Sequence, residues 1–172
     1  MEKTENRTYR RKEKAQGMVE FALTLPILLM LFFGIIEFGR LLFVYSATTT
    51  AAREAARYGS AAGDDGSSIP YYRNCTGIED AALRIGGIAG LQRSDIEIYY
   101  DIDEDGLQDP STIDSLPPCG NSTQIDLGDR IVVRVKVRYQ PIVPLVNLSS
   151  FDISSVSIRT ILLDLDMEDQ DV

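Results

Sequence analysis

An uncharged apolar run near the N-terminus constrains this chain more than any other feature. Residues 21–36 read FALTLPILLMLFFGII, and apolar residues resume with LLFVY after Glu37-Phe38-Gly39-Arg40. The hydrocarbon core of a bilayer needs about 20 residues of helix. The stretch from Phe21 to Tyr45 meets that length if Glu37 and Arg40 are tolerated. Their spacing of three lets them pair on one helix face, or they can snorkel toward an interface. The run therefore predicts a single membrane-spanning helix.

Two simpler interpretations of the run account for less of it. A cleavable secretory signal has an apolar core of about 7–15 residues, which is shorter than this run. A generic signal anchor accounts for the apolar run and its basic flank, but not for Glu20, an acid at the mouth of the run, where a charge usually has a partner. Pro26 lies early in the run, where neighbouring helices or local bends can absorb a kink.

The charges divide the chain into a basic start and an acidic remainder. Residues 1–17 carry six basic and three acidic side chains, whereas residues 46–172 carry 10 basic and 21 acidic ones. A basic flank beside an apolar run is retained in the cytoplasm. We therefore expect a basic cytoplasmic leader at residues 1–15, a single pass through the cytoplasmic membrane, and an extracytoplasmic C-terminal domain. The acidic part has no electrostatic attraction for nucleic acid, so we expect no nucleic-acid partner.

The sequence after the apolar run continues the helix. SATTTAAREAARYG is rich in Ala, the best helix former, and contains no Pro or Gly before Gly59. We predict one transmembrane and extended helix over residues 16–58. Ala47, Ala51 and Ala55 recur every four residues and give a smooth face on which another helix can pack closely. The alternative is that this face packs only onto the chain's own globular domain, and both can hold at once.

The remainder predicts an α+β domain in which a small antiparallel β-sheet lies against the long helix. A flexible Gly- and Ser-containing link is expected at residues 59–74, the domain at 75–165 and a solvated acidic tail at 166–172. Within the domain, apolar residues at helical spacing predict a short helix over 77–89. Alternation predicts strands over 94–100, 130–139 and 153–163.

The composition limits the chemistry of this domain. The chain has no His, which excludes a Ser-His, Cys-His or His-metal mechanism within it. No catalytic constellation is evident, so we expect no enzymatic activity. Cys75 and Cys119 are predicted to form one disulfide if the domain lies outside the cytoplasm. Two free thiols, or one partner thiol each, are the alternative.

An acidic segment between the first two predicted strands resembles an EF-hand-type loop. Its ligand positions 1, 3, 5 and 9 are acidic, position 6 is Gly106, and position 7 would offer a backbone carbonyl. Position 12 is Thr112 instead of a bidentate Glu, so Asp114 or a water would complete the shell. The candidate Ca²⁺ ligands are Asp101, Asp103, Asp105, Leu107 and Asp109. The alternative is an acidic, solvated turn without a metal.

Four motifs of the N-terminal region together resemble the TadE-like family. They are VEFAL from Val19, Pro26, EFGR at residues 37–40, and AAREAARYG at residues 51–59. The resemblance covers about 45 residues and is specific as a combination. It implies a non-enzymatic minor pilin, or pseudopilin, of the Tad/Flp tight-adherence pilus system, which is type IV pilus-like. The implied partners are other pilins, pilus assembly proteins and a prepilin peptidase.

The same resemblance implies proteolytic processing just before the apolar helix. In prepilin-like sequences a Gly often precedes the cut and a Glu is the fifth mature residue. If Glu20 is that Glu, the cut falls between Ala15 and Gln16, after an Ala. If Gly17 marks the cut, Glu20 is the third mature residue. We favour the first position. Residues expected to serve assembly are Glu20, Phe21, Pro26, Glu37 and Arg40.

In such an assembly, we expect Glu20 to pair with the N-terminal amine of a neighbouring mature subunit. A new N-terminal amine among apolar helices would be costly to desolvate, and a carboxylate of a neighbouring subunit can pair with it. The alternative is an interfacial Glu20 that faces lipid headgroups. At the level of the whole chain, the alternative to a pilin is a signal-anchored extracytoplasmic binding domain with a Ca²⁺-stabilised loop that never joins a pilus. Processing separates the two, because only the pilin is expected to be cut.

Overall fold

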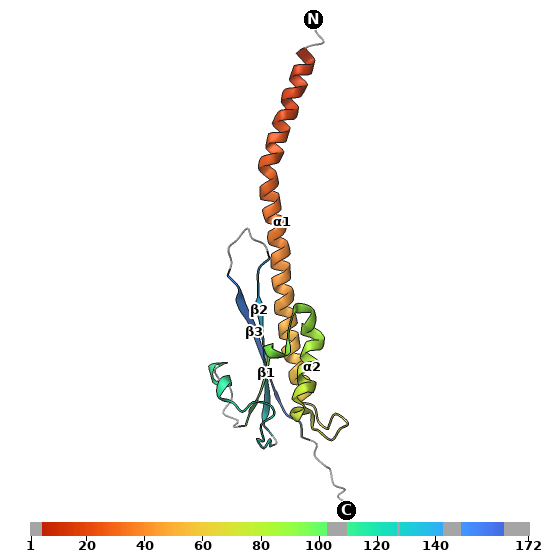
Figure 1. Cartoon of the computed structure of the whole chain (residues 1–172), viewed down its shortest axis with the longest axis vertical. Helices are drawn as coiled ribbons and strands as arrows, with labels where there is room; N and C mark the ends of the chain where they lie inside the picture. Colours follow the sequence, from red (N-terminus) through yellow and green to blue (C-terminus); the bar gives the residue numbers. More distant parts are fainter. Residues whose placement is uncertain (1–4, 103–109, 127, 143–148, 164–172) are drawn as a thin grey trace, which may run out of the picture. The chain divides into compact units, whose positions relative to one another are not determined.

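The computed structural model describes residues 5–102, 110–126, 128–142 and 149–163, with backbone only at 5–15 and 110–112. The chain is α+β, as predicted. In order, it contains α1 (Glu5–Gly59), α2 (Cys75–Gly86), β1 (Ile96–Asp101), β2 (Arg130–Tyr139) and β3 (Phe151–Thr160), with short 3-10 turns between them (Figure 1). It forms two compact units. One comprises Met1–Leu41 and Pro141–Ser149, and the other comprises Leu42–Gln140 and Ser150–Val172.

Helix α1 is longer than the sequence predicted. It begins at Glu5 instead of residue 16 and ends at Gly59. Residues 5–15, ENRTYRRKEKA, are rich in Arg, Lys and Glu, which are good helix formers, and contain no Pro or Gly. The helix therefore runs through the predicted leader and the predicted cleavage position without a break. It also continues through Pro26.

The C-terminal part of α1 belongs to the second unit and packs there against the sheet and α2. Ala51, Ala52, Ala55 and Ala56 are fully buried. A methyl group built on Gly86 of α2 would lie 3.3 Å from the Ala51 Cβ, so the two helices are in close contact. Of the predicted Ala stripe, Ala51 and Ala55 are thus buried within the chain's own domain. This part of the predicted face therefore packs within the chain's own domain.

The sheet is antiparallel, with the strand order β1-β2-β3. In the register of its central strand, Val133 pairs with Ile98 of β1 and with Ser157 of β3. Val133, Val135, Val137 and Tyr139 are buried, whereas Arg134, Lys136 and Arg138 alternate with them and are more exposed. Strand β2 has the predicted bounds because apolar residues alternate with charged ones from Val133 to Tyr139, after a buried apolar start at Ile131–Val133, and Pro141 follows shortly after its end.

The peripheral elements differ from prediction by a few residues. Helix α2 starts at Cys75 because the Asn74 side chain caps it, accepting a hydrogen bond from the Gly77 N–H at 2.8 Å. The helix ends at Gly86, and a 3-10 turn covers the rest of the predicted helix, Gly87–Ala89. Strand β1 starts two residues late because Arg93–Asp95 form another 3-10 turn. Strand β3 spans Phe151–Thr160, displaced toward the N-terminus from the predicted 153–163.

Candidate assembly helix and the predicted cation loop

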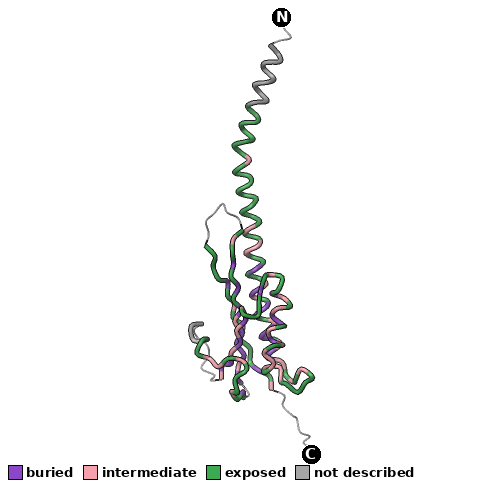
Figure 2. Tube along the Cα trace, viewed as in Figure 1, coloured by how far each residue is buried: buried purple, intermediate pink, exposed green. Residues whose placement is uncertain are grey.

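Residues 16–36 of α1 present most of their apolar side chains outward. Large residues such as Phe21, Leu23, Ile27 and Ile35 are exposed, and Figure 2 shows this part of the helix as exposed over most of its length. Within the described part of the chain, one helix, Gln16–Gly59, is long and apolar enough to cross a membrane, by length and composition. Apolar surface of this extent marks a membrane or protein interaction site.

Glu20 lies at the start of this apolar surface and is exposed. Its carboxylate accepts a hydrogen bond from the Gln16 side-chain amide, with the Nε2 and Oε1 atoms 3.1 Å apart. Its backbone carbonyl accepts another from the Thr24 hydroxyl at 2.8 Å. One helical turn on either side of Glu20 therefore links it to Gln16 and Thr24. Since Gln16 is the predicted first mature residue, the uncut chain already holds its side chain against the carboxylate expected to receive an amine.

The remaining predicted processing and packing residues lie on the same continuous helix. Gln16 and Gly17 are exposed, and among the described residues no side chain or distant backbone atom lies within 4 Å of a methyl group built on Gly17. Ala15 is helical, but its side chain lies outside the described residues. Phe21 projects from the exposed surface. Pro26 lacks the N–H that would bond the carbonyl of Ala22.

Glu37 and Arg40 form the pair that their spacing predicted. The Arg40 Nη2 atom lies 3.4 Å from Glu37 Oε1. The same carboxylate oxygen accepts a hydrogen bond from the backbone N–H of Ile142, also at 3.4 Å. Ile142 follows β2 in the sequence and belongs to the same unit as this part of α1. No sequence pattern indicates this contact, because the partners are 105 positions apart.

The predicted Ca²⁺ loop lies mostly outside the described residues. Asp103, Asp105, Leu107 and Asp109 fall there. Asp101 is described: it ends β1, is buried, and its carboxylate pairs with the Arg130 guanidinium across the β1–β2 ladder. Among the described residues no group of three or more His, Cys, Asp or Glu side chains is placed to hold a metal. The Ca²⁺ site stays a prediction.

Asp114, the predicted supplementary ligand, has a salt-bridge partner in this structure. Its carboxylate pairs with Arg134 of β2, and the same guanidinium also pairs with Glu97 of β1. Asp114 lies in the 3-10 turn Pro110–Ser115, whose neighbouring side chain Ile113 is 1% exposed. Arg134 thus joins two strands and this turn on the sheet face opposite to Val133.

Cys75 and Cys119 are joined by a disulfide, with their Cα atoms 5.9 Å apart. The bond links the first residue of α2 to a segment that extends the sheet. The Tyr100 N–H donates to the Pro117 carbonyl and the Cys119 N–H donates to the Ile98 carbonyl, both at 2.9 Å. The predicted Cys75–Cys119 disulfide is therefore present in the fold.

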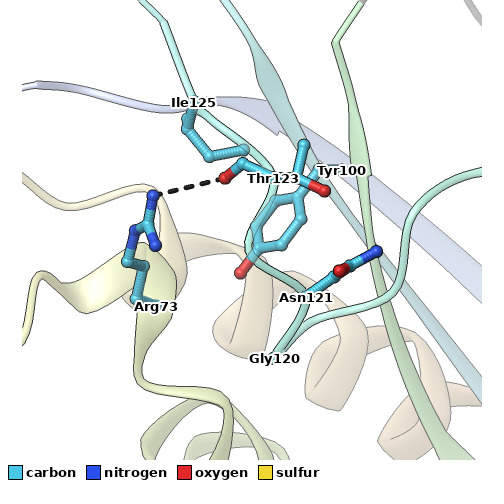
Figure 3. Close-up of a pocket in the computed structure, with 6 residues that line it drawn as sticks. All are labelled: Arg73, Tyr100, Gly120, Asn121, Thr123 and Ile125. Atoms are coloured by element: carbon cyan, nitrogen blue, oxygen red, sulfur yellow. Dashed lines mark hydrogen bonds between the residues drawn. The ribbon is translucent and has the colours of Figure 1, made fainter.

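A hollow of about 200 Å³ lies beside this disulfide, lined by the residues drawn in Figure 3: Arg73, Tyr100, Gly120, Asn121, Thr123 and Ile125. The Tyr100 hydroxyl donates to the Tyr72 carbonyl at 2.6 Å and lies 3.0 Å from Cys119 Sγ. Burial raises the pKa of Tyr100 to about 12. The phenol is therefore a neutral structural donor at physiological pH. Sequence reasoning missed this hollow, whose only signal was a Tyr at an inward-facing strand position.

Comparison with known proteins identifies the N-terminal region alone. Residues 15–57 match the family model described as TadE-like protein. No significant match was found among curated proteins or among solved structures. The matched region is a quarter of the chain. It includes the exposed apolar part of α1 with Glu20 and Glu37, and also the buried Ala residues at 51–56. At residues 15–57, this chain carries a TadE-like family domain.

Proposed function

We propose that this chain is a minor pilin, or pseudopilin, of a Tad/Flp-type pilus, anchored by α1 and acting as a non-enzymatic assembly component. One observation carries the proposal: the TadE-like match includes the helix segment, residues 16–43, most of whose large apolar side chains are exposed instead of packed into the chain's own core. A helix with such a surface reaches a low free energy in lipid or against other apolar helices. Lateral packing of these helices would bring subunits together.

The orientation follows from charge and redox chemistry. The basic residues before Gln16 favour the cytoplasmic side. The Cys75–Cys119 disulfide suits an oxidising compartment for the domain that follows the anchor. We therefore place the N-terminus in the cytoplasm and the α+β domain outside. Other pilins, assembly proteins and a prepilin peptidase are the proposed partners.

Glu20 is the proposed assembly contact. After a cut between Ala15 and Gln16, the new amine lies one helical turn from Glu20 in its own chain, and the Gln16 side chain already reaches that carboxylate. A neighbouring subunit shifted along the helix axis would offer the same carboxylate to the amine. Glu20→Gln keeps the size and removes the charge. It should reduce recruitment into the assembly, measured by co-purification with pilus components, whereas Glu54→Gln should not. Unchanged recruitment of Glu20→Gln contradicts the pairing.

The first experiment is the intact mass and N-terminal sequence of the protein extracted from its native membrane. A terminus at Gln16 or Met18 supports processing and fixes the position of Glu20. The matched control is the same extraction from cells that lack the prepilin peptidase, which should yield the unprocessed chain. An unprocessed terminus in both cells contradicts the pilin and supports a fixed, signal-anchored binding domain.

Ca²⁺ binding by the Asp101–Asp109 segment is a separate proposal, supported by ligand chemistry. Titration calorimetry and thermal melting of the full chain in detergent test it. Binding requires heat uptake or release and a raised melting temperature with millimolar Ca²⁺, in the range of extracellular Ca²⁺ modules. Replacing Asp103 and Asp105 by Asn should abolish both effects. Absence of both in the unaltered chain rejects the Ca²⁺ site.

A further inference from the structure

The contact between Glu37 and Ile142 joins the apolar helix to a residue outside the N-terminal motifs. Glu37 lies within the apolar part of α1, with its side chain 17% exposed. Its carboxylate accepts hydrogen bonds from the Arg40 guanidinium and from the Ile142 backbone N–H. A carboxylate in an apolar setting is costly unless it is paired and hydrogen-bonded. These two hydrogen bonds therefore satisfy the Glu37 carboxylate in lipid surroundings, where no water is present to donate hydrogen bonds to it.

Helix geometry places this contact at one edge of a bilayer. Glu20 precedes the uncharged apolar stretch of residues 21–36, and Glu37 and Arg40 follow it, with Arg40 twenty positions from Glu20. At about 1.5 Å per residue Glu20 and Arg40 are separated by ~30 Å, the thickness of the hydrocarbon core. If Glu20 lies at one surface, Arg40 lies at the other. Glu37 then lies about one helical turn inside that second surface, and so does the backbone that it binds.

The Ile142 side chain is suited to lipid at that depth. It is 70% exposed although it is a large aliphatic group. Its neighbour Pro141 has no N–H to satisfy. The sequence from Tyr139 to Phe151 contains no charged residue, although a quarter of the chain is charged. Phe38, which precedes Arg40 on the same stretch of α1, is also exposed. An apolar side chain held beside the membrane helix gains by leaving water.

We propose that Glu37 and Arg40 hold Pro141–Ile142 at the non-cytoplasmic surface of the bilayer, so that the Ile142 side chain inserts into lipid as a second membrane contact beside α1. The inference rests on the proposed membrane span of α1. It goes beyond that proposal, because it assigns a lipid contact to Ile142, just after β2, and a positioning role to Glu37. The partner is the acyl-chain region of the bilayer.

The chain contains no Trp, so a single introduced Trp reports its own surroundings. Three full-length variants are reconstituted into phosphatidylcholine vesicles, with and without lipids brominated on their acyl chains. Ile142→Trp tests the proposal. Leu28→Trp, in the middle of the apolar run, reports lipid. Ile88→Trp replaces a residue of the second unit that is 84% exposed, so its indole reports an aqueous environment. It is a matched control for Ile142→Trp, because both introduced indoles have the same intrinsic preference for membrane interfaces.

The expected result is that brominated lipid quenches the Ile142→Trp variant at least about twofold more than the Ile88→Trp variant, and that aqueous iodide quenches it less. Equal quenching of these two variants by both agents, while lipid quenches the Leu28→Trp variant, overturns the lipid contact and leaves the membrane span intact. Failure of brominated lipid to quench the Leu28→Trp variant overturns the span, and the inference with it.

The role of Glu37 is tested in the Ile142→Trp background. Glu37→Ala should lower the lipid quenching of the introduced indole and shift its emission to the red. Glu54→Ala is the matched control, because Glu54 forms the same kind of pair with Arg57 on the same helix, at 2.8 Å, outside this contact. Equal effects of the two substitutions, or no effect of Glu37→Ala, overturn the positioning role.

Discussion

Gly86 and Gly87 are adjacent at the end of α2, but their surroundings differ. A methyl group at Gly86 would lie 2.5 Å from Leu91 Cδ2 and 3.3 Å from the Ala51 Cβ. In the part of the chain that the structure describes, no side chain or distant backbone atom lies within 4 Å of one at Gly87. Both have right-handed helical backbone angles, so backbone strain does not separate them. Gly86→Ala should lower the free energy of unfolding by about 1–3 kcal/mol through overpacking.

Gly87→Ala is the control for that prediction. It should leave the stability unchanged or raise it by up to about 1 kcal/mol, because it reduces the entropy of the unfolded chain without a clash. Urea unfolding of both variants in detergent, followed by tyrosine circular dichroism, gives the comparison. Equal stability of the two variants would show that Gly86 does not pack closely against Leu91 and Ala51.

Tyr100 makes the stability of the domain dependent on alkaline pH. Burial raises its pKa to about 12, from an ordinary value of 10. Because the pKa is raised in the folded state, the contribution of the protonated Tyr100 to the free energy of unfolding is complete below pH 10. It is lost as the pH rises from 10 to 12, because the unfolded chain releases the proton first. The free energy of unfolding should fall by about 2 kcal/mol over that range, once solvent screening is allowed for.

Tyr100→Phe isolates this effect. The variant loses the hydrogen bond to the Tyr72 carbonyl, so it should be about 1 kcal/mol less stable at pH 8. Its stability should then fall less steeply than that of the unaltered chain between pH 10 and 12. Urea unfolding at each pH measures both slopes. Parallel slopes would mean that another group, such as Tyr58, whose pKa is also raised by burial, dominates the alkaline transition.

At the scale of elements, the disulfide joins α2 to the segment beside β1 and closes a loop of 44 positions. A loop of that length restricts the unfolded chain by about 4 kcal/mol in the chain-entropy model. Replacing both Cys75 and Cys119 by Ser should therefore lower the midpoint of urea unfolding strongly. Reduction of the unaltered chain should match the double variant. A difference below about 1 kcal/mol would mean that the unfolded chain keeps these segments together.

The elements that the sequence predicted well are those with a strong local pattern. The alternation of Val and charged residues in β2 from Val133 onward predicted its bounds, and the Ala-rich continuation of α1 predicted its C-terminal end near Gly59. The start of α1 was predicted wrongly because the leader was interpreted from its charge, and those same charged residues are good helix formers. The contacts of Glu37 with Ile142 and of Arg134 with Asp114 join distant positions. No periodicity carries information about such pairs.

At the scale of the whole molecule, the interior of the fold belongs to the second unit. Each buried apolar residue that the structure describes lies between Val44 and Ile161. None of the most apolar window of α1 is buried. A chain that begins at Leu42 should therefore fold without the anchor, form the Cys75–Cys119 disulfide and unfold cooperatively in urea. It should stay in the aqueous phase on detergent phase partition, where the full chain enters the detergent phase.

The outcome shows whether the anchor part of α1 stabilises the domain or is free for contacts with lipid and other helices. Cooperative unfolding of the shortened chain, at a midpoint close to that of the full chain, means that residues 16–41 contribute nothing to the interior. Their side chains, including Phe21 and Ile27, are then left for lipid and for other helices. A shortened chain that aggregates or lacks a cooperative transition would mean that the anchor stabilises the domain. Substitutions in the apolar run would then affect folding before assembly, and Glu20→Gln would need a folding control.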